Sequence, residues 1–382
     1  MDFSLTEEQK ALQAMAKEFA EKEMKPNAAK YDKGEEFPKD VMQKAFEAGF
    51  LNVMVPEEYG GPGLSDIDIV IISEELAGGC AGMYTTMMVN SLAHTPIILF
   101  GTDEQKRRFL TPQTEKMSFA SFCLTEREAG SDASAQKTKA KKVGSEYVIN
   151  GSKCFISNGG IASQYVVFAN SKPERGIRGI SAFVVPRDTP GVIIGKEEDK
   201  MGHRASNTVE LIFEDVRIPE ENLLGKEGMG FIIAMKTLDK TRAPVGAAGV
   251  GVARAAMEYA VEYSRNRIQF GKPIALFQHT SFQIAQMATE INAARLLVWN
   301  AAWLLDQGLP CGKESSMAKL FGSDVAMKVT TDALQILGGY GYMKDYPMEK
   351  LMRDAKLLQI YEGTNEIQHM IIAREVIGPI KQ

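Results

Sequence analysis

The chain has 382 residues, of which 45% are hydrophobic and 24% are charged, and its formal net charge at pH 7 is -5. This length and composition are typical of a globular protein with two or three domains. The negative net charge argues against a nucleic-acid partner, and no apolar run approaches the roughly 18 residues that span a membrane.

The N-terminus, the cysteines and the histidines bear on compartment and metal binding. The first residues are acidic and lead directly into a helical pattern, without the features of a signal or transit peptide. The four cysteines are scattered, which favours free thiols in a reducing compartment. We therefore expect a cytoplasmic protein of bacterial type, although a processed organellar protein would look the same. The four histidines lack the spacing of metal ligands, so we predict no metal site.

Residues 6–108 carry a helical pattern. Thr6 and Gln9 form a capping box at the start of a first helix, which Pro26 ends. A second helix is predicted over residues 38–48, and a loop rich in glycine and proline follows at 51–64. Residues 67–100 form a long apolar stretch typical of a core helix. These elements predict an N-terminal helical domain over residues 1–117.

The pattern changes to short strands and turns over residues 118–226. Strands are predicted at 147–149, 154–156, 165–169, 180–185 and 209–213. Asn150 and Gly151, between the first two, predict a hairpin turn. This region reads as a compact all-β domain between two helical ones.

Long helices return over residues 227–382. They are predicted at 231–265, with a break at Pro244, at 281–307, ended by Gly308, at 314–337, and after Thr364. Gly249 and Gly251 begin a G-x-G pattern, but they lie inside a helix, so we interpret them as sites of close helix packing and reject a dinucleotide site. The long helices predict an up-down bundle.

One turn near the C-terminus carries a candidate catalytic group. Glu362 follows Ile360-Tyr361 and precedes Gly363, and Thr364 is a good N-cap for a new helix. A glutamate in an apolar-flanked turn can have a raised pKa, which suits a general base. A solvated glutamate in a loop between helices is the alternative.

The surrounding sequence resembles a known family. Met352-Arg353-Asp354-Ala355-Lys356, followed by Ile360-Tyr361-Glu362-Gly363-Thr364-Asn365-Glu366-Ile367-Gln368, is similar to the C-terminal signature of the acyl-CoA dehydrogenases. The matching glutamate of that family removes the α proton of an acyl-CoA thioester. The resemblance therefore implies that Glu362 is the catalytic base.

Further segments in the same order resemble the family's FAD-binding segments, over nearly the whole chain. The loop at 124–132 has Arg127 where the family usually has proline, and Phe155 and Ser157 replace a tryptophan and a threonine. In the family, an arginine matching Arg267 pairs with the FAD pyrophosphate of a neighbouring subunit, a role that suits its bidentate fork. The implied FAD contacts are Phe122, Leu124, Thr125, Gly130, Ser131, Phe155, Ile156, Ser157, Arg267, Phe270, Gln278, Gln335, Gly338, Gly339, Thr364 and Glu366.

The resemblance also implies a substrate site, a fold and a mechanism. Substrate contacts are expected at Ser131, Tyr361 and Gly363, and contacts with the adenosine end of coenzyme A at Asp239 and Arg242. The implied α+β fold has N-terminal helices, a middle β-barrel or β-sandwich domain and a C-terminal four-helix bundle, in a homotetramer with one FAD per subunit. The β hydrogen would leave as hydride to the flavin, while a flavin ribityl hydroxyl and the backbone N–H of the base polarise the thioester carbonyl. An electron-transferring flavoprotein would reoxidise the flavin.

The acyl group is constrained by the helix expected to line its pocket. Family members acting on glutaryl-CoA carry an arginine where this chain has Met83, and no arginine occurs between Cys80 and Lys106. This argues against a dicarboxylic acyl chain. The same stretch offers Met87, Asn90, Ser91 and His94, which suits a short, medium or cyclic acyl chain.

Three alternatives remain open at this point. The same chemistry could run in reverse as an enoyl-CoA reductase, because the sequence does not determine direction. An acyl-CoA oxidase-like enzyme would pass electrons to oxygen. A non-catalytic binding protein would have no need of Glu362 or of the FAD segments.

Overall fold

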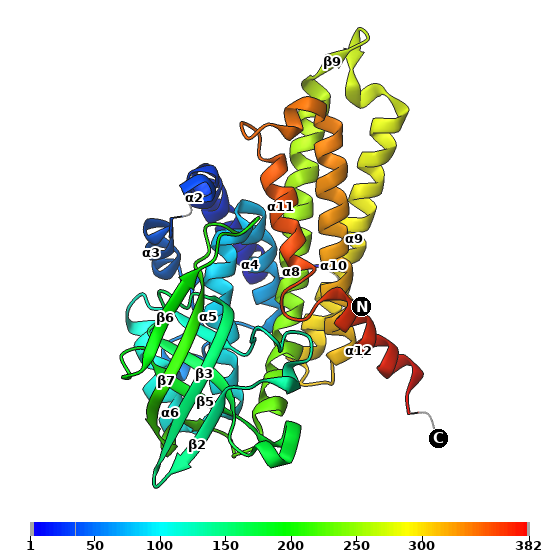
Figure 1. The fold of residues 1–382 in the computed structure, drawn as a ribbon. Coiled ribbons are helices and arrows are strands. Elements are labelled where there is room, and N and C mark those ends of the chain that lie inside the picture. The colour runs from blue at the N-terminus through cyan, green and yellow to red at the C-terminus, as the bar shows by residue number, and fades with distance from the viewer. Residues whose placement is uncertain (1–3, 35, 380–382) are drawn as a thin grey trace.

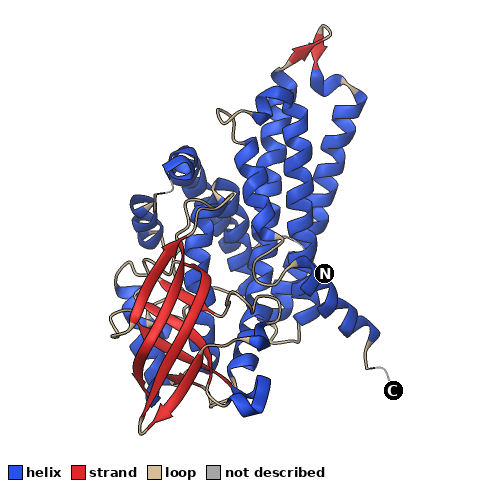
Figure 2. Ribbon diagram, viewed as in Figure 1, coloured by secondary structure: helices blue, strands red, loops and turns tan. Residues whose placement is uncertain are grey.

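The computed structural model describes residues 4–34 and 36–379 and shows three parts that follow one another along the chain (Figure 1). Figure 2 separates them by secondary structure: the main sheet lies to one side, and the other parts are mainly helical apart from one small hairpin. This is the predicted α+β architecture, with helices, then strands, then helices. Within the described residues, none of the helices is long and apolar enough to cross a membrane.

The N-terminal part is entirely helical. Thr6 and Gln9 form the predicted capping box, but the chain does not stop at Pro26, because a π turn and a 3-10 turn carry it on into the next helix. The predicted helix at 67–100 is two helices, since Cys80 between them is extended with a φ of -165°. The helices are α1 (Glu7–Phe19), α2 (Ala28–Gly34), α3 (Lys39–Glu47), α4 (Asp66–Gly79), α5 (Ala81–Phe100), α6 (Asp103–Phe109) and α7 (Thr111–Glu115).

The middle part is a strongly curved mixed sheet with the strand order β6-β7-β3-β2-β4-β5-β8, in which β1 pairs with β4. Its strands are β1 (Ala120–Cys123), β2 (Lys139–Val143), β3 (Glu146–Ser157), β4 (Gln164–Asn170), β5 (Ile180–Pro186), β6 (Val192–Glu197), β7 (Thr208–Pro219) and β8 (Leu223–Leu224).

The hairpin predicted at Asn150-Gly151 is wrong. β3 runs straight through both residues, and the turn between β2 and β3 instead uses Gly144, which has a φ of +64°. Gly151 has a φ of +148° and sits at a register shift against β7, so it forms a bulge inside the strand. A β-carbon there would lie 2.7 Å from the Cα of Thr138. The glycine therefore serves close strand packing.

The C-terminal part is an antiparallel bundle. Its elements are α8 (Gly230–Asn266), the small hairpin β9 (Ile268–Gln269) and β10 (Lys272–Pro273), α9 (Gln278–Asp306), α10 (Gly312–Leu337), α11 (Met348–Leu358) and α12 (Asn365–Ile377). The first four helices form the bundle, and β9 lies at the end remote from the main sheet (Figure 1).

Tight packing around α8 explains two features of its sequence. The predicted break at Pro244 is wrong, because α8 continues through the proline while its buried side chains stay packed against α10 and α4. Close packing at the two glycines is confirmed: a β-carbon on Gly251 would lie 2.0 Å from the Glu74 carbonyl oxygen, and one on Gly249 would lie 2.4 Å from that of Gly322.

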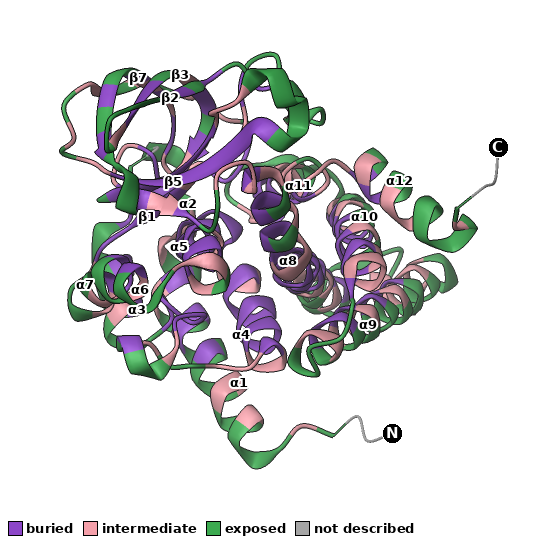
Figure 3. Cartoon of the chain, turned by 90° about the horizontal axis from the view of Figure 1, so that it is seen from below, coloured by how far each residue is buried: buried purple, intermediate pink, exposed green. Residues whose placement is uncertain are grey.

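Buried ion pairs join the N-terminal part to the bundle. Glu74 on α4 accepts hydrogen bonds from Arg295 on α9 at 2.8 and 2.9 Å and pairs with Arg254 on α8 at 3.1 Å. Seen from below, the purple buried faces of α4, α5 and α8 lie together in the middle of the molecule, with the sheet above them (Figure 3). The core is therefore continuous between the parts.

Candidate active site

The turn between α11 and α12 holds Glu362 in an uncommon backbone conformation. Glu362 has a φ of +52° and Gly363 a φ of +92°, so two consecutive residues are left-handed. A non-glycine residue there is sparsely populated, and such strain clusters at functional sites. Thr364 caps α12 as predicted, because its side chain accepts from the backbone N–H of Ile367 at 3.4 Å.

The Glu362 carboxylate meets a hydroxyl from the middle of the bundle. Thr241, which is fully buried on α8, donates its Oγ1 hydrogen to Glu362 Oε2 at 2.6 Å. Removal of the carboxylate from water raises its pKa to about 7, although the Thr241 bond and the charges of Arg242 and Lys319 act in the opposite direction. A carboxylate with this pKa accepts a proton effectively near neutral pH.

The two residues expected to contact coenzyme A flank this site on α8. Arg242 is only 2% exposed, and its Nη1 donates to Asp239 Oδ1 at 2.8 Å. Desolvation lowers the pKa of Arg242, while the charges of Asp239 and Glu362 support its charged form. The guanidinium therefore lies beside the base, and its contact with the adenosine end of coenzyme A stays a prediction.

The segments of the middle part that are predicted to contact the flavin meet along β3. The backbone N–H of Cys154 donates to the Thr125 carbonyl at 3.0 Å, which ties the loop at 124–132 to the strand. The fully buried Lys153 donates to the Leu124 carbonyl at 3.1 Å. Next to them, Phe155 has a φ of +57° and is 66% exposed, while Ile156 is buried. The sheet therefore presents an open aromatic face beside a polar loop, of which Gly130 and Ser131 are exposed.

Helix α5 connects these segments to the turn of Glu362. The Asn158 side chain, at the end of β3, donates to the Thr86 carbonyl at 2.9 Å. The preceding residue of α5, Thr85, shares a hydrogen bond with Tyr361 and lies 2.9 Å from His203 Nδ1. The residue after β3, Asn158, and the turn residue Tyr361 therefore contact consecutive residues of α5.

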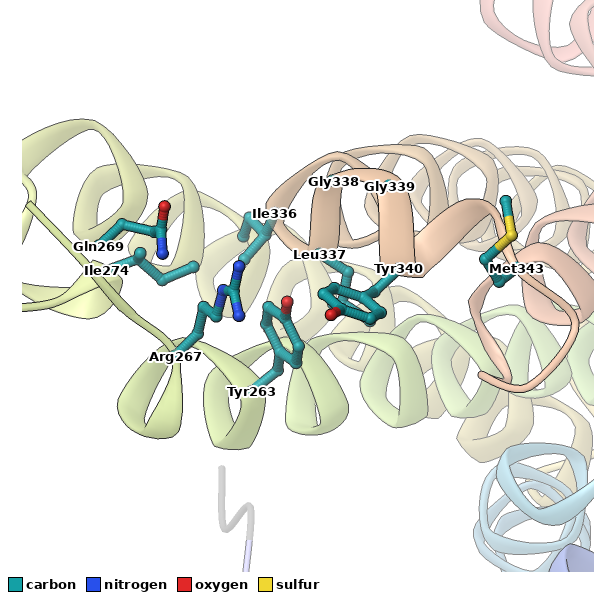
Figure 4. Close-up of a pocket in the computed structure, with 10 residues that line it drawn as sticks. All are labelled: Tyr263, Arg267, Gln269, Ile274, Ile336, Leu337, Gly338, Gly339, Tyr340 and Met343. Atoms are coloured by element: carbon teal, nitrogen blue, oxygen red, sulfur yellow. The ribbon is translucent and has the colours of Figure 1, made fainter.

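A second group of candidates lies elsewhere, at the far end of the bundle. Arg267, Gly338 and Gly339 line a pocket of about 460 Å³ together with Tyr263 and Tyr340 (Figure 4). The Arg267 guanidinium lies 5.4 Å from the centre of the Tyr340 ring. Gln335, Phe270 and Gln278 come from segments adjoining this pocket but do not line it, and Phe270 is 93% exposed at the tip of the β9-β10 hairpin.

The two groups are far apart within one chain. Arg267 ends the helix that carries Thr241, and 26 positions of an α-helix correspond to about 39 Å. This length exceeds that of one dinucleotide cofactor. A cofactor that reacts beside Glu362 therefore does not reach Arg267 of the same subunit.

Two residues of the site were missed at the level of sequence. Thr241 lies inside the segment Asp239-Lys240-Thr241-Arg242, and only the fold shows that its hydroxyl faces Glu362. Lys319 is fully buried on α10, and its Nζ donates to the Gly363 carbonyl. Its signal in the sequence is a charged residue on a helix face of small side chains, with Ser315, Gly322 and Ser323 three or four positions away.

Three family models match successive parts of the chain. They describe the acyl-CoA dehydrogenase N-terminal domain at residues 6–116, the middle domain at 121–216 and the C-terminal domain at 228–377. The chain belongs to the acyl-CoA dehydrogenase family. It is therefore an oxidoreductase, and the resemblance inferred from the sequence is confirmed.

Individual relatives match over nearly their whole length. An acyl-CoA dehydrogenase of Bacillus subtilis is 47% identical, covering 98% of this chain and 99% of the relative. The acryloyl-CoA reductase (NADH) of Anaerotignum propionicum is 49% identical, covering 99% and 96%. A short-chain specific acyl-CoA dehydrogenase of Clostridium acetobutylicum is 45% identical, covering 98% and 100%.

Solved structures share the fold. A chain in the structure of the electron transferring flavoprotein of Acidaminococcus fermentans has a TM-score of 0.97 at 50% identity, covering 99% of this chain and 100% of that chain. The butyryl-CoA dehydrogenase of Megasphaera elsdenii has a TM-score of 0.97 at 45% identity and the same coverage. The FAD complex of PigA has a TM-score of 0.94 at 30% identity, covering 98% and 99%.

The residues present here fit the FAD of this family. The exposed face of Phe155 offers an apolar plate beside the polar loop at 124–132. At the second pocket, a β-carbon on Gly338 or Gly339 would meet no atom within 4 Å, so the backbone is open beside the Arg267 guanidinium. An open backbone next to an arginine suits a pyrophosphate. Acyl-CoA dehydrogenases are FAD enzymes, and FAD is the cofactor of this chain.

Proposed function

We propose that this enzyme removes one hydrogen from each of the α and β carbons of a short-chain acyl-CoA thioester, giving the trans-2-enoyl-CoA, with Glu362 as the base. The observation that carries the proposal is the partly buried Glu362 carboxylate, with a pKa of about 7, held by the Thr241 hydroxyl at 2.6 Å. FAD, when bound, supplies the acceptor for the hydride that leaves the β carbon.

The chain itself moves the proton and stabilises the negative charge that follows. Glu362 takes the α proton, and its ionised form is available near pH 7 because its pKa lies there. Loss of this proton puts negative charge on the thioester oxygen, which needs donors that are already oriented. We assign the backbone N–H of Glu362 to that oxygen, since the left-handed turn aims this group independently of the helices on either side.

The short acyl chain is inferred from the packing beside the base. Tyr84 on α5 donates its hydroxyl hydrogen to the Pro244 carbonyl at 3.2 Å, and its pKa is raised by burial and by the charge of Glu362. A cavity of about 10 Å³ is lined by the side chains of Tyr84, Met87 and Met88. Space for about one water molecule does not accept a long alkyl chain. Similarity to short-chain and butyryl-CoA dehydrogenases supports the same substrate class.

The electron acceptor is proposed to be an electron-transferring flavoprotein. The similarity to a chain solved with the electron transferring flavoprotein of Acidaminococcus fermentans supports this acceptor. A second function, reduction of a short enoyl-CoA, is favoured by the 49% identity to an acryloyl-CoA reductase. The two functions share the proton site and differ only in the direction of electron flow.

We also propose that the enzyme is a homotetramer in which the Arg267 pocket binds the FAD of a neighbouring subunit. The separation of about 39 Å from Thr241 supports a contribution across subunits. Exposed apolar side chains at the same end of the bundle, namely Ile268, Phe270, Leu276 and Phe282, are consistent with a buried interface there.

Anaerobic titration of the purified enzyme with a panel of acyl-CoA thioesters tests the reaction. We expect a four-carbon thioester to bleach the flavin absorbance in the wild type but not in Glu362→Gln. Glu375→Gln, an exposed change on α12, is the matched control and should bleach normally. If Glu362→Gln bleached as fast as the wild type, the assignment of the base would be wrong. Bleaching by dithionite without binding of any thioester would reject the reaction itself.

A further inference from the structure

A buried ammonium group lies directly beneath the turn of the proposed base. Lys319 on α10 has no exposed surface, and its Nζ donates to the Gly363 carbonyl and to Asn365 Oδ1, both at 2.8 Å. Burial of an ammonium group is expensive, and an apolar side chain of similar volume is often at least as stable. A lysine at this position therefore calls for a reason beyond folding.

The hydrogen bonds of Lys319 act on the residues just after Glu362. The Gly363 carbonyl also accepts from Gln368 Nε2 at 2.9 Å, so it is held from two sides. Asn365, the first residue of α12, is fixed in turn by Asp324, whose Oδ1 accepts from its Nδ2 at 2.7 Å. These bonds hold the start of α12 in place. The left-handed residues Glu362 and Gly363 precede it in the turn that leads from α11.

The charges around Lys319 come from three helices and the turn. The carboxylates of Glu362 in the turn, Asp324 on α10 and Glu366 on α12 favour its charged form, while the Arg242 guanidinium on α8 disfavours it. Burial is the largest effect and lowers the pKa of Lys319 to about 7. The positive charge in turn lowers the pKa of Glu362. Base and lysine therefore titrate in the same range, each supporting the ionised form of the other.

We propose that Lys319 is a positioning residue for the base: it holds the Gly363 carbonyl, so that the Glu362 carboxylate is aimed, and its charge favours the ionised carboxylate. This inference rests on the proposed role of Glu362. When Glu362 takes the substrate proton, Lys319 loses the attraction of its negative charge, and the reverse proton transfer restores that attraction. In this scheme the lysine does not touch the substrate and acts only on Glu362, through the turn and through its charge.

The test compares Lys319→Met, which removes both the charge and the bonds, with Lys319→Gln, which removes the charge but keeps a donor. Lys328→Met is the matched control, because Lys328 is a half-exposed lysine on the same helix, paired with Glu290 and Asp332. Each holoenzyme is assayed for kcat and KM with butyryl-CoA from pH 5.5 to 9.5 and for its melting temperature. The kinetic isotope effect of α-deuterated substrate reports on the proton step.

In Lys319→Met we expect kcat/KM at pH 7 to fall by about 10- to 100-fold, because a small misplacement of a catalytic group has an effect of this size. KM should change less than about threefold, and the isotope effect on kcat should rise. The acidic limb of the pH profile should move to higher pH in both Met and Gln variants, by about one pH unit. Lys328→Met should match the wild type in every respect.

The inference would be overturned if the Lys319→Gln profile coincided with that of the wild type, whatever happened to the melting temperature. A purely structural lysine would lower stability without moving the profile. If Lys319→Met failed to fold, Lys319→Gln and Lys319→Arg would decide, since Arg keeps the charge and should keep the position of the acidic limb. Full activity of Glu362→Gln would instead reject the proposed function, so the two failures are distinguishable.

Discussion

At the scale of single residues, the site depends on a carboxylate held between opposing influences. Burial raises the pKa of Glu362, and the Thr241 hydroxyl, Arg242 and Lys319 lower it, with a result of about 7. Without these partners the base would be protonated at neutral pH, and without burial it would be too weak a base. The balance between these groups therefore sets the pH range in which Glu362 ionises.

Thr241→Val tests one side of this balance. Loss of the hydroxyl donor at 2.6 Å should raise the pKa of Glu362, because a hydrogen bond to a charged group is worth about 1.5–3 kcal/mol. We expect kcat/KM to fall about tenfold at pH 7 and much less at pH 9, where Glu362 is ionised in both enzymes. Thr241→Ser keeps the hydroxyl and should retain the wild-type profile, which steady-state kinetics over pH would show. An equal loss at both pH values would contradict the assignment.

Glu362→Gln tests the effect of burial on the Glu362 pKa, through the pH dependence of protein stability. Because the pKa of Glu362 is raised to about 7 in the folded protein, well above the usual range of a glutamate, the fold loses stability as pH rises from that range to about 7. The full loss, reached above pH 7, should be about 1–3 kcal/mol in the free energy of unfolding, allowing for the partial exposure of the turn. The melting temperature of the glutamine variant should therefore equal that of the wild type near pH 5 and exceed it by about 2–5 °C at pH 8. A constant difference between pH 5 and pH 8 would show that Glu362 titrates normally.

At the scale of elements, α8 organises the molecule. Its 37 residues carry Thr241 beside the base, Arg254 against the N-terminal helices and, at its C-terminal end, Arg267. Its small residues allow α4 and α10 to approach closely, as the contacts predicted for β-carbons on Gly251 and Gly249 indicate. A single rigid helix therefore links the proposed base, the domain contact and the second pocket.

Arg254→Met should weaken the contact between α4 and α8. Arg254 Nη2 donates to Glu75 at 2.5 Å and its Nε pairs with Glu74 at 3.1 Å, and both carboxylates are buried. Without the arginine, the buried carboxylates of Glu74 and Glu75 lose part of the positive charge that balances them. This should lower the free energy of unfolding by about 2–4 kcal/mol. We expect the melting temperature to fall by several degrees at pH 7.5. Arg265→Met, an exposed change on the same helix, should leave it unchanged, and an equal effect of both changes would contradict the role of the pair.

At the scale of the whole molecule, the segments predicted to bind FAD divide into two groups that lie far apart within one subunit. The loop at 124–132 and Phe155 lie with the base, through their contacts with α5. Arg267, Gly338 and Gly339 form a separate pocket at the far end of the bundle. This separation supports our proposal that a second copy of the chain completes the cofactor site.

Complementation between inactive subunits tests this arrangement. Arg267→Ala should lose FAD on gel filtration, because the arginine is proposed to hold the pyrophosphate of a neighbour, while Glu362→Gln should keep FAD but lack activity. When both are co-expressed with different tags and the mixed oligomers are isolated, an Arg267→Ala subunit has an intact base and receives Arg267 from its partner. Activity should then exceed that of either parent by at least tenfold. Mixed oligomers no more active than the Arg267→Ala parent would show that Arg267 acts within its own subunit.

The amino-acid sequence was enough to predict the family and the order of helical and β parts, and it led to the proposal that Glu362 is the base. These properties follow from local patterns, such as the periodicity of apolar residues, the N-cap at Thr364 and the segment around Glu362, and all three lie within short stretches of chain. The role of Gly249 and Gly251 in packing could also be predicted, because glycines inside a helix have few other uses.

The contacts that these stretches make with distant residues depend on the tertiary structure. It showed that Gly151 is a bulge and not a turn, and that α8 passes through Pro244, because packing outweighs the local preferences of glycine and proline. It also brought Thr241 and Lys319, 121 and 43 positions before Glu362, against the same turn. The pKa of a carboxyl depends on burial and on charges within a few ångströms, and both are products of the fold rather than of neighbouring residues in the chain.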